Sequence, residues 1–103
     1  EKDSVKILNP HASTEQAYLE QVRNTFDSLK AESVDIICAS AGFDNADGDW
    51  GGVLTKQGYI KMGQWMKEYS EKLCEGRRFA ILEGGYNYEL MAENLHAFCK
   101  NMG

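Results

Sequence analysis

Two short apolar runs, each followed within three residues by a glycine, constrain the fold of this sequence more than any other feature. Residues 34–39 read VDIICA and residues 78–82 read RFAIL, and glycine-containing loops follow at 42–52 and 83–85. The first run is nearly continuous in apolar and β-branched residues, which is typical of a strand covered on both faces in a parallel sheet, and the second run is predicted as another strand. The long stretch between the runs has helical spacing, which favours a parallel crossover over a hairpin.

Three other stretches have the spacing of amphipathic helices. We expect a helix at about 14–31, where Ser13 and Gln16 resemble a capping box, and another between Thr55 and Gly76, which fit its N-cap and its C-terminal glycine. Asn87 can cap a third helix. The apolar positions that define the three faces are Tyr18, Val22, Phe26 and Leu29, then Tyr59, Met62, Met66 and Leu73, then Met91, Leu95 and Phe98.

A short run at 5–8 (VKIL) fits an edge strand, so the predicted order is βαβαβα. This order is typical of the α/β class, with a parallel sheet between helices in a three-layer αβα arrangement. The length of 103 residues allows a single unit over 1–103. Three parallel strands alone leave edges and faces uncovered, so we expect an isolated chain of this kind to self-associate.

The charge balance and the lengths of the apolar runs argue against two classes of partner, nucleic acids and membranes. Eleven Lys and Arg stand against sixteen Asp and Glu, giving a net charge of −5 with no dense basic stretch, so direct nucleic-acid binding is not expected. No apolar run is long enough to span a membrane.

Cys38, Cys74 and Cys99 form no paired spacing, which favours reduced thiols, with Cys38 buried, and a cytoplasmic location. In a eukaryote a nuclear location is the alternative.

Loops after parallel strands are where chemistry is expected, because ligands bind beyond the carboxyl ends of such strands. Asp44 follows the first run and Tyr86 the second, so neighbouring strands would place a carboxylate and a phenol at one crevice. Gly84 and Gly85 allow close backbone approach, or form only a tight turn.

Other interpretations of these loops and of the histidines have less support in the sequence. Asp44, Asp47 and Asp49 lack the spacing and closing glutamate of a calcium loop, and no phosphate-binding glycine motif is present. His11 and His96 fit surface or capping positions, and no nucleophile triad is indicated.

The motifs SAGFD at 40–44, GD at 48–49, LT at 54–55, GY at 58–59 and LEGGYN at 82–87, in this order, resemble the last third of the histone deacetylase family. That family includes acetylpolyamine amidohydrolases and acetoin-utilisation proteins. The resemblance implies the arginase/deacetylase α/β fold and a zinc-dependent deacetylase acting on acylated amines. It assigns Asp44 as a zinc ligand and Tyr86 as the donor to the scissile carbonyl, with Gly84 and Gly85 in the substrate loop.

The sequence departs from the family pattern in ways that affect activity. It contains no Asp-x-His element, which supplies the family's other metal ligands, and no His-His pair. Asn45 and Ala46 stand where the family has Ala-His, and the loop around Trp50 is about two residues shorter than in the family. A catalytic zinc takes three protein ligands, so this chain alone is expected to be inactive. Two hypotheses remain: a segment of a zinc amidohydrolase, or a small α/β module that binds partners or self-assembles without hydrolase activity.

Overall fold

The computed structural model describes residues 10–30, 33–42, 52–84 and 88–103. Helices and strands alternate along the chain: α1 (Glu15–Asp27), β1 (Ile37–Ala41), α2 (Lys56–Cys74), β2 (Arg78–Leu82) and α3 (Tyr88–Met102). β1 and β2 pair in parallel, with Ile37 opposite Arg78 and Ala41 opposite Leu82. The predicted α/β class and parallel sheet are confirmed. The predicted strand at 5–8 lies outside the described residues.

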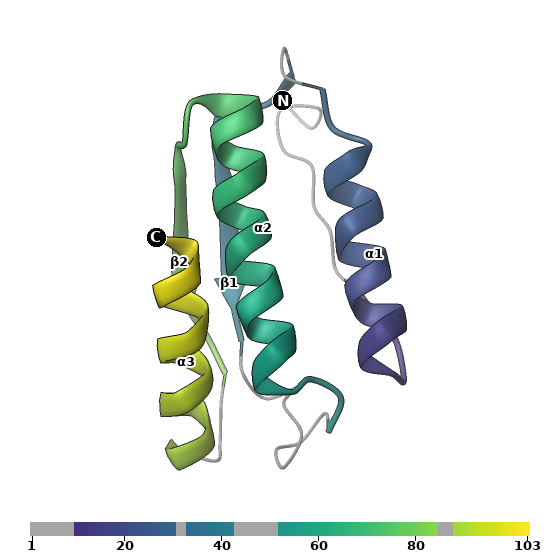
Figure 1. Ribbon diagram of the computed structural model, residues 1–103, viewed down its shortest axis with the longest axis vertical. Coiled ribbons are helices and arrows are strands. Elements are labelled where there is room, and N and C mark those ends of the chain that lie inside the picture. Colours follow the sequence, from purple (N-terminus) through teal and green to yellow (C-terminus); the bar gives the residue numbers. More distant parts are fainter. Residues whose placement is uncertain (1–9, 31–32, 43–51, 85–87) are drawn as a thin grey trace.

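The three helices form one layer beside the two strands (Figure 1). α2 packs against both strands and along α3, and α1 flanks α2. The core lies within this layer and against one face of the sheet, where Ile37, Ala39 and Ala80 contact a buried cluster. The members of that cluster are Leu54, Tyr59, Met66 and Phe98.

The opposite face of the sheet is exposed among the described residues. Cys38 and Ser40 on β1 and Phe79 and Ile81 on β2 alternate with the core-facing positions, and all four are exposed. For the strand predicted at 34–39, the expectation that it is covered on both faces is therefore wrong. The expectation that Cys38 is buried is wrong as well. Period-2 alternation sends these side chains away from α2, and the described helices cover only the α2 side.

Two glycines shape the packing of α2. A Cβ on Gly63 would lie 2.5 Å from the carbonyl oxygen of Phe98, so the absence of a side chain lets α3 approach the α2 backbone. At the C-terminus of α2, Glu75 takes a left-handed conformation (φ 59°) and Gly76 follows with φ 82°. Gly76 thus lies just past the end of α2, as predicted, but the left-handed C-cap is Glu75.

Arg78 joins three parts of the chain near the start of β2. Its Nε donates to the carbonyl of Met102 at 2.6 Å, and Nη1 donates to Ser70 Oγ at 3.1 Å and to the Gly76 carbonyl at 3.0 Å. Ser70 is fully buried. One guanidinium therefore fixes the ends of α2 and α3 to the sheet.

The start and end of α1 differ from the sequence prediction. Thr14, not Ser13, is the N-cap, and its hydroxyl accepts a hydrogen bond from the Ala17 amide at 3.2 Å. The Gln16 side chain donates to Glu20 instead of closing a capping box. The helix stops at Asp27, four residues earlier than predicted, because Ser28 caps it and the Leu29 amide bonds to the carbonyl of Phe26.

The first sheet strand begins three residues later than predicted. Pairing starts where the Ile37 amide donates to the carbonyl of Arg77, and the Arg77 side chain donates to the carbonyl of Asp35 at 2.6 Å. The partner strand therefore sets the start of β1. β2 itself and the Thr55 N-cap of α2 agree with the prediction. The predicted cap at Asn87 lies outside the described residues.

Candidate functional site

The carboxyl ends of β1 and β2 lie side by side, because Ala41 pairs with Leu82 in the parallel register. The condition set in the sequence analysis, that the two runs form neighbouring strands, is therefore met. Gly42 follows β1, and Glu83 and Gly84 follow β2, so both loops leave the sheet at the same edge. This edge is where an open parallel sheet binds its ligands.

The structure describes one of the four predicted site residues. Gly84 follows β2 by two residues and is half-buried. Asp44, Gly85 and Tyr86 lie outside the described residues, as do Asp47 and Asp49. Their assignments rest on the motif and stay predictions. His11 and His96 are both exposed, as expected of surface histidines.

The loop after β1 rejoins the described chain at Gly52, just before α2. Gly52 has φ +63°, and a Cβ placed there would meet open space. Leu54, two residues on, is 1% exposed in the core cluster. Thr55 then caps α2 with an extended backbone. The α2 end of this loop is thus fixed by the burial of Leu54.

A carboxylate from α1 also holds this point. Glu15 accepts a hydrogen bond from the Thr55 amide at 2.5 Å, and the Thr55 hydroxyl lies 2.8 Å from Oε2 of the same carboxylate. A Cβ on Gly58 would lie 2.5 Å from Oε2 of Glu15, so the carboxylate occupies the space that a side chain there would take. Sequence periodicity gave no signal for this contact, because Glu15 and Thr55 are 40 residues apart.

The opposite end of the α1–α2 contact holds a different polar group. The Tyr69 hydroxyl donates to Asp27, and its ring stacks on Phe26 with centroids 4.9 Å apart. The hydrogen bond to Asp27 and burial raise the pKa of Tyr69 above its ordinary value. Asp27 and Tyr69 lie far along their helices from Glu15 and Thr55, so this group stabilises the fold rather than the strand ends.

The described residues do not form a complete zinc site. No group of three His, Cys, Asp or Glu side chains among them could hold a metal ion. The one carboxylate ligand that the resemblance of the motifs predicts, Asp44, lies outside the described residues. A catalytic zinc requires two more protein ligands, which these residues do not supply.

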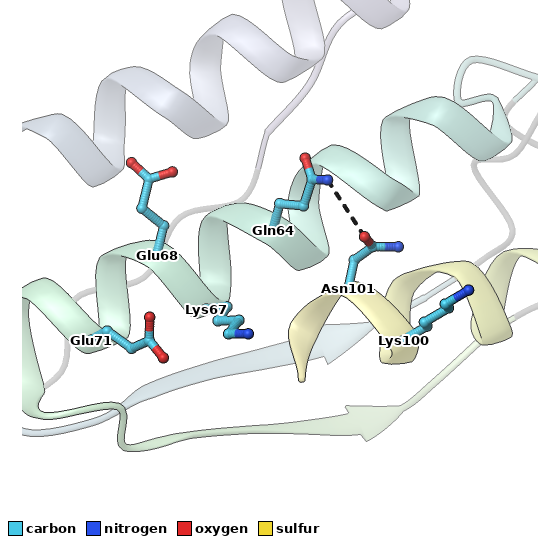
Figure 2. A pocket seen from close by; sticks show the side chains of 6 residues that line it. All are labelled: Gln64, Lys67, Glu68, Glu71, Lys100 and Asn101. Atoms are coloured by element: carbon cyan, nitrogen blue, oxygen red, sulfur yellow. Dashed lines mark hydrogen bonds between the residues drawn. The ribbon is translucent and has the colours of Figure 1, made fainter.

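A shallow groove of about 350 Å³ between α2 and α3 does not compete as a site. Its side chains are Gln64, Lys67, Glu68, Glu71, Lys100 and Asn101. In Figure 2, Gln64 bonds to Asn101, while Glu68 and Lys100 point in different directions rather than toward a common point. The groove has mixed charges, lies away from the strand ends and has the features of a solvated helix surface.

Comparison with known proteins agrees with the resemblance of the motifs. The model of the histone deacetylase domain matches residues 1–102. Histone deacetylase 15 of Arabidopsis thaliana is 40% identical over 72 residues, which are 68% of this chain and 12% of that protein. A probable deacetylase of Archaeoglobus fulgidus is 33% identical over 89 residues, 84% of this chain and 25% of that protein.

This chain belongs to the histone deacetylase family. Its α/β fold, with parallel strands and intervening helices, is consistent with the arginase/deacetylase fold of that family. The chain spans a quarter or less of the length of these two relatives. In the described part of the chain, no helix is long and apolar enough to cross a membrane.

Proposed function

We propose that this chain is one segment of a zinc-dependent amidohydrolase domain that removes acetyl or similar acyl groups from amines of the acetyl-lysine or acetylpolyamine type. The observation that carries the proposal is the shared edge at the ends of β1 and β2, from which the SAGFD and LEGGYN motifs continue. Membership of the family supports the deacetylase class.

In this proposal two side chains of the segment have separate roles. Asp44 supplies one carboxylate ligand to zinc, and the remaining ligands come from sequence outside these 103 residues or from another chain. The Tyr86 hydroxyl donates a hydrogen bond to the oxygen of the scissile carbonyl, where negative charge develops in the transition state. Gly84 and Gly85 keep the loop free of side chains beside the substrate. The 103-residue chain alone then binds zinc weakly and does not hydrolyse acetyl-lysine peptides.

Substitution of Asp44 tests the proposal in the natural protein that carries this chain. Asp44→Ala removes a metal ligand, so zinc content after dialysis and deacetylase turnover should fall together. Asp47→Ala is the matched control, because it removes the same group from the same loop outside the family motif. Full zinc retention and normal turnover in Asp44→Ala would contradict the proposal, and so would equal losses in the two variants.

The exposed face of the sheet favours a second role, self-association. Its large apolar side chains are Phe79 and Ile81 on β2, together with Ile36 just before β1, and they are 44–53% exposed. Apolar residues gathered on one face mark an interaction surface. In this reading the isolated chain assembles through the exposed face, and a module without hydrolase activity would use the same surface.

Three free thiols fit a reducing compartment, the cytoplasm or nucleus.

A further inference from the structure

We propose that α1 is a latch helix, which opens from α2 as a unit while the sheet, α2 and α3 stay folded. Two polar contacts between α1 and α2, one at each end of α1, hold it closed. The movement is a property of described residues alone and is independent of the proposed amidohydrolase function.

α1 is attached to the rest of the fold along one side. Among the described helices and strands it contacts α2 and neither strand nor α3. Figure 1 shows it flanking α2 on the side opposite to α3. Val22 is the one buried residue of α1, whereas α2 buries residues along its whole length. Elements with few buried contacts open at a lower free energy than the elements of the core.

The first polar contact joins the start of α1 to the start of α2. The Glu15 carboxylate accepts hydrogen bonds from the Thr55 amide at 2.5 Å and from the Thr55 hydroxyl at 2.8 Å. Gly58 is buried, and a Cβ there would lie 2.5 Å from Glu15 Oε2. The contact therefore depends on a carboxylate from α1 and on the space left by a glycine of α2.

The second polar contact joins the end of α1 to α2. Asp27 accepts a hydrogen bond from the Tyr69 hydroxyl, and the Phe26 ring stacks on the Tyr69 ring with centroids 4.9 Å apart. Tyr69 is 5% exposed, so water reaches little of this pair while α1 is closed. The helical rise between Glu15 and Asp27 places the two contacts about 18 Å apart along α1. Each end of the helix thus has its own attachment.

An apolar stripe lies between the two attachments. Tyr18 and Phe26 pack against the buried core cluster, and Val22, between them on the same face, is 7% exposed. Opening of α1 transfers these side chains to water, which opposes the movement. The polar contacts add to this cost, so removing either one should make opening more frequent without changing the closed structure elsewhere.

The rest of the fold is joined without α1. Gly63 lets α3 approach the α2 backbone, and Arg78 fixes the ends of α2 and α3 to the sheet through Ser70 and Met102. None of these contacts includes a residue of α1. Separation of α1 therefore leaves α2, α3 and the two strands held together.

The residues just before α1 move with it. The Gln21 side chain exchanges two hydrogen bonds with the backbone of His11, at 3.0 and 2.7 Å. These bonds fold the segment at 11–14 back along α1 rather than onto α2. The unit that opens thus extends from His11 to the end of α1.

Hydrogen exchange of the natural protein that carries this chain tests the proposal, with α1, α2 and α3 measured as separate peptides. In the wild type, the amides of α1 should exchange together and faster than those of α2 and α3, because they open as one unit. Gly58→Ala and Tyr69→Phe leave the sequence of α1 unchanged. Each should raise exchange throughout α1 about tenfold, the loss expected for a hydrogen bond to a charged group, while α3 keeps the wild-type rate.

Combined and control variants separate the two contacts. Glu15→Ala breaks the first contact from α1, and adding it to Gly58→Ala should give no further increase, since both remove one contact. Gly58→Ala with Tyr69→Phe should multiply the two effects, because the contacts lie at opposite ends. Gln64→Ala is the matched control: Gln64 is exposed on α2 and bonds to Asn101 of α3, so α1 should exchange as in the wild type.

Three results would overturn the proposal. Wild-type α1 that exchanges at the rate of α2 and α3 would show that it opens only when the whole structure unfolds. Faster exchange of all three helices in the variants would show a general loss of stability. An increase confined to the end of α1 nearest each substitution would show local fraying instead of a latch. Deacetylase turnover enters none of these measurements, so they stand whether or not the proposed function fails.

Discussion

The two faces of the sheet are built from similar side chains but have different surroundings. On one face Ile37, Ala39 and Ala80 contact the core under α2, and on the other Phe79 and Ile81 remain exposed. The alternating pattern of the strands therefore provides two apolar faces, of which the described helices cover one. An apolar strand pattern therefore predicts that a face of the sheet can be covered, but it does not identify the element that covers it.

The largest expected effect on the covered side is that of Arg78→Ala. It removes the donors to Met102, Ser70 and Gly76, leaving a buried hydroxyl and two carbonyls without them. We expect a loss of about 2–4 kcal/mol in the free energy of unfolding, measured by urea denaturation. Arg77→Ala is the control: Arg77 is exposed, and its loss should cost about 1 kcal/mol. Equal losses would contradict the joining role of Arg78.

A smaller loss is expected where α2 and α3 approach most closely. Gly63→Ala places a Cβ 2.5 Å from the Phe98 carbonyl oxygen, so the helices must separate. We expect destabilisation of about 1–3 kcal/mol by thermal or urea unfolding, although alanine favours an isolated helix. Gln64→Ala, at an exposed neighbouring position, should be nearly neutral. A Gly63→Ala protein more stable than the wild type would show that the interface accommodates the methyl group.

The Tyr69–Asp27 hydrogen bond between α1 and α2 should show itself through pH. Because the pKa of Tyr69 is raised from 10.0, its contribution to stability is complete below pH 10 and is lost as pH rises through the raised pKa. Tyr69→Phe should cost about 1 kcal/mol at pH 7. The difference between the variant and the wild type should shrink above pH 10. A difference that stays constant with pH would mean that the hydrogen bond contributes nothing.

A substitution on the exposed face of the sheet should change the free energy of unfolding least and self-association most. Ile81→Lys changes a half-exposed side chain, so the free energy of unfolding should move by no more than about 0.5 kcal/mol. Light scattering at high micromolar concentration should show an assembled wild type and a more monomeric Ile81→Lys protein. Gln64→Lys, which adds the same charge on α2, should assemble like the wild type. A monomeric wild type would remove the proposed role of this face.

Elements with local sequence signals could be predicted closely. β2 lies at 78–82 as predicted. α2 begins at the predicted threonine cap and ends, after the left-handed C-cap Glu75, just before the predicted Gly76. The start of β1 and the end of α1 could not be predicted, because the first depends on pairing with Arg77 and Arg78 and the second on bonds around Ser28.

The candidate site shows the same division. The βαβ pattern predicts parallel strands but left open whether the two runs are neighbours, and the assignments of Asp44 and Tyr86 rest on the resemblance of their motifs to the family. The contact between Glu15 and Thr55 spans 40 residues and involves a glutamate that, in the sequence, only marks a helix start. Contacts of this kind depend on how α1 and α2 pack, which apolar periodicity does not specify.

We propose that the loops at this edge of the sheet serve one amidohydrolase site. Substitution of Tyr86 is the most direct test of this proposal. In the natural protein, Tyr86→Phe removes only a hydroxyl, so zinc content and substrate binding should stay near those of the wild type. Deacetylase turnover should fall by roughly 10²–10³, the loss expected for one donor to a developing oxyanion. Near-normal turnover with zinc retained would contradict the account, because Tyr86 would then have no catalytic role.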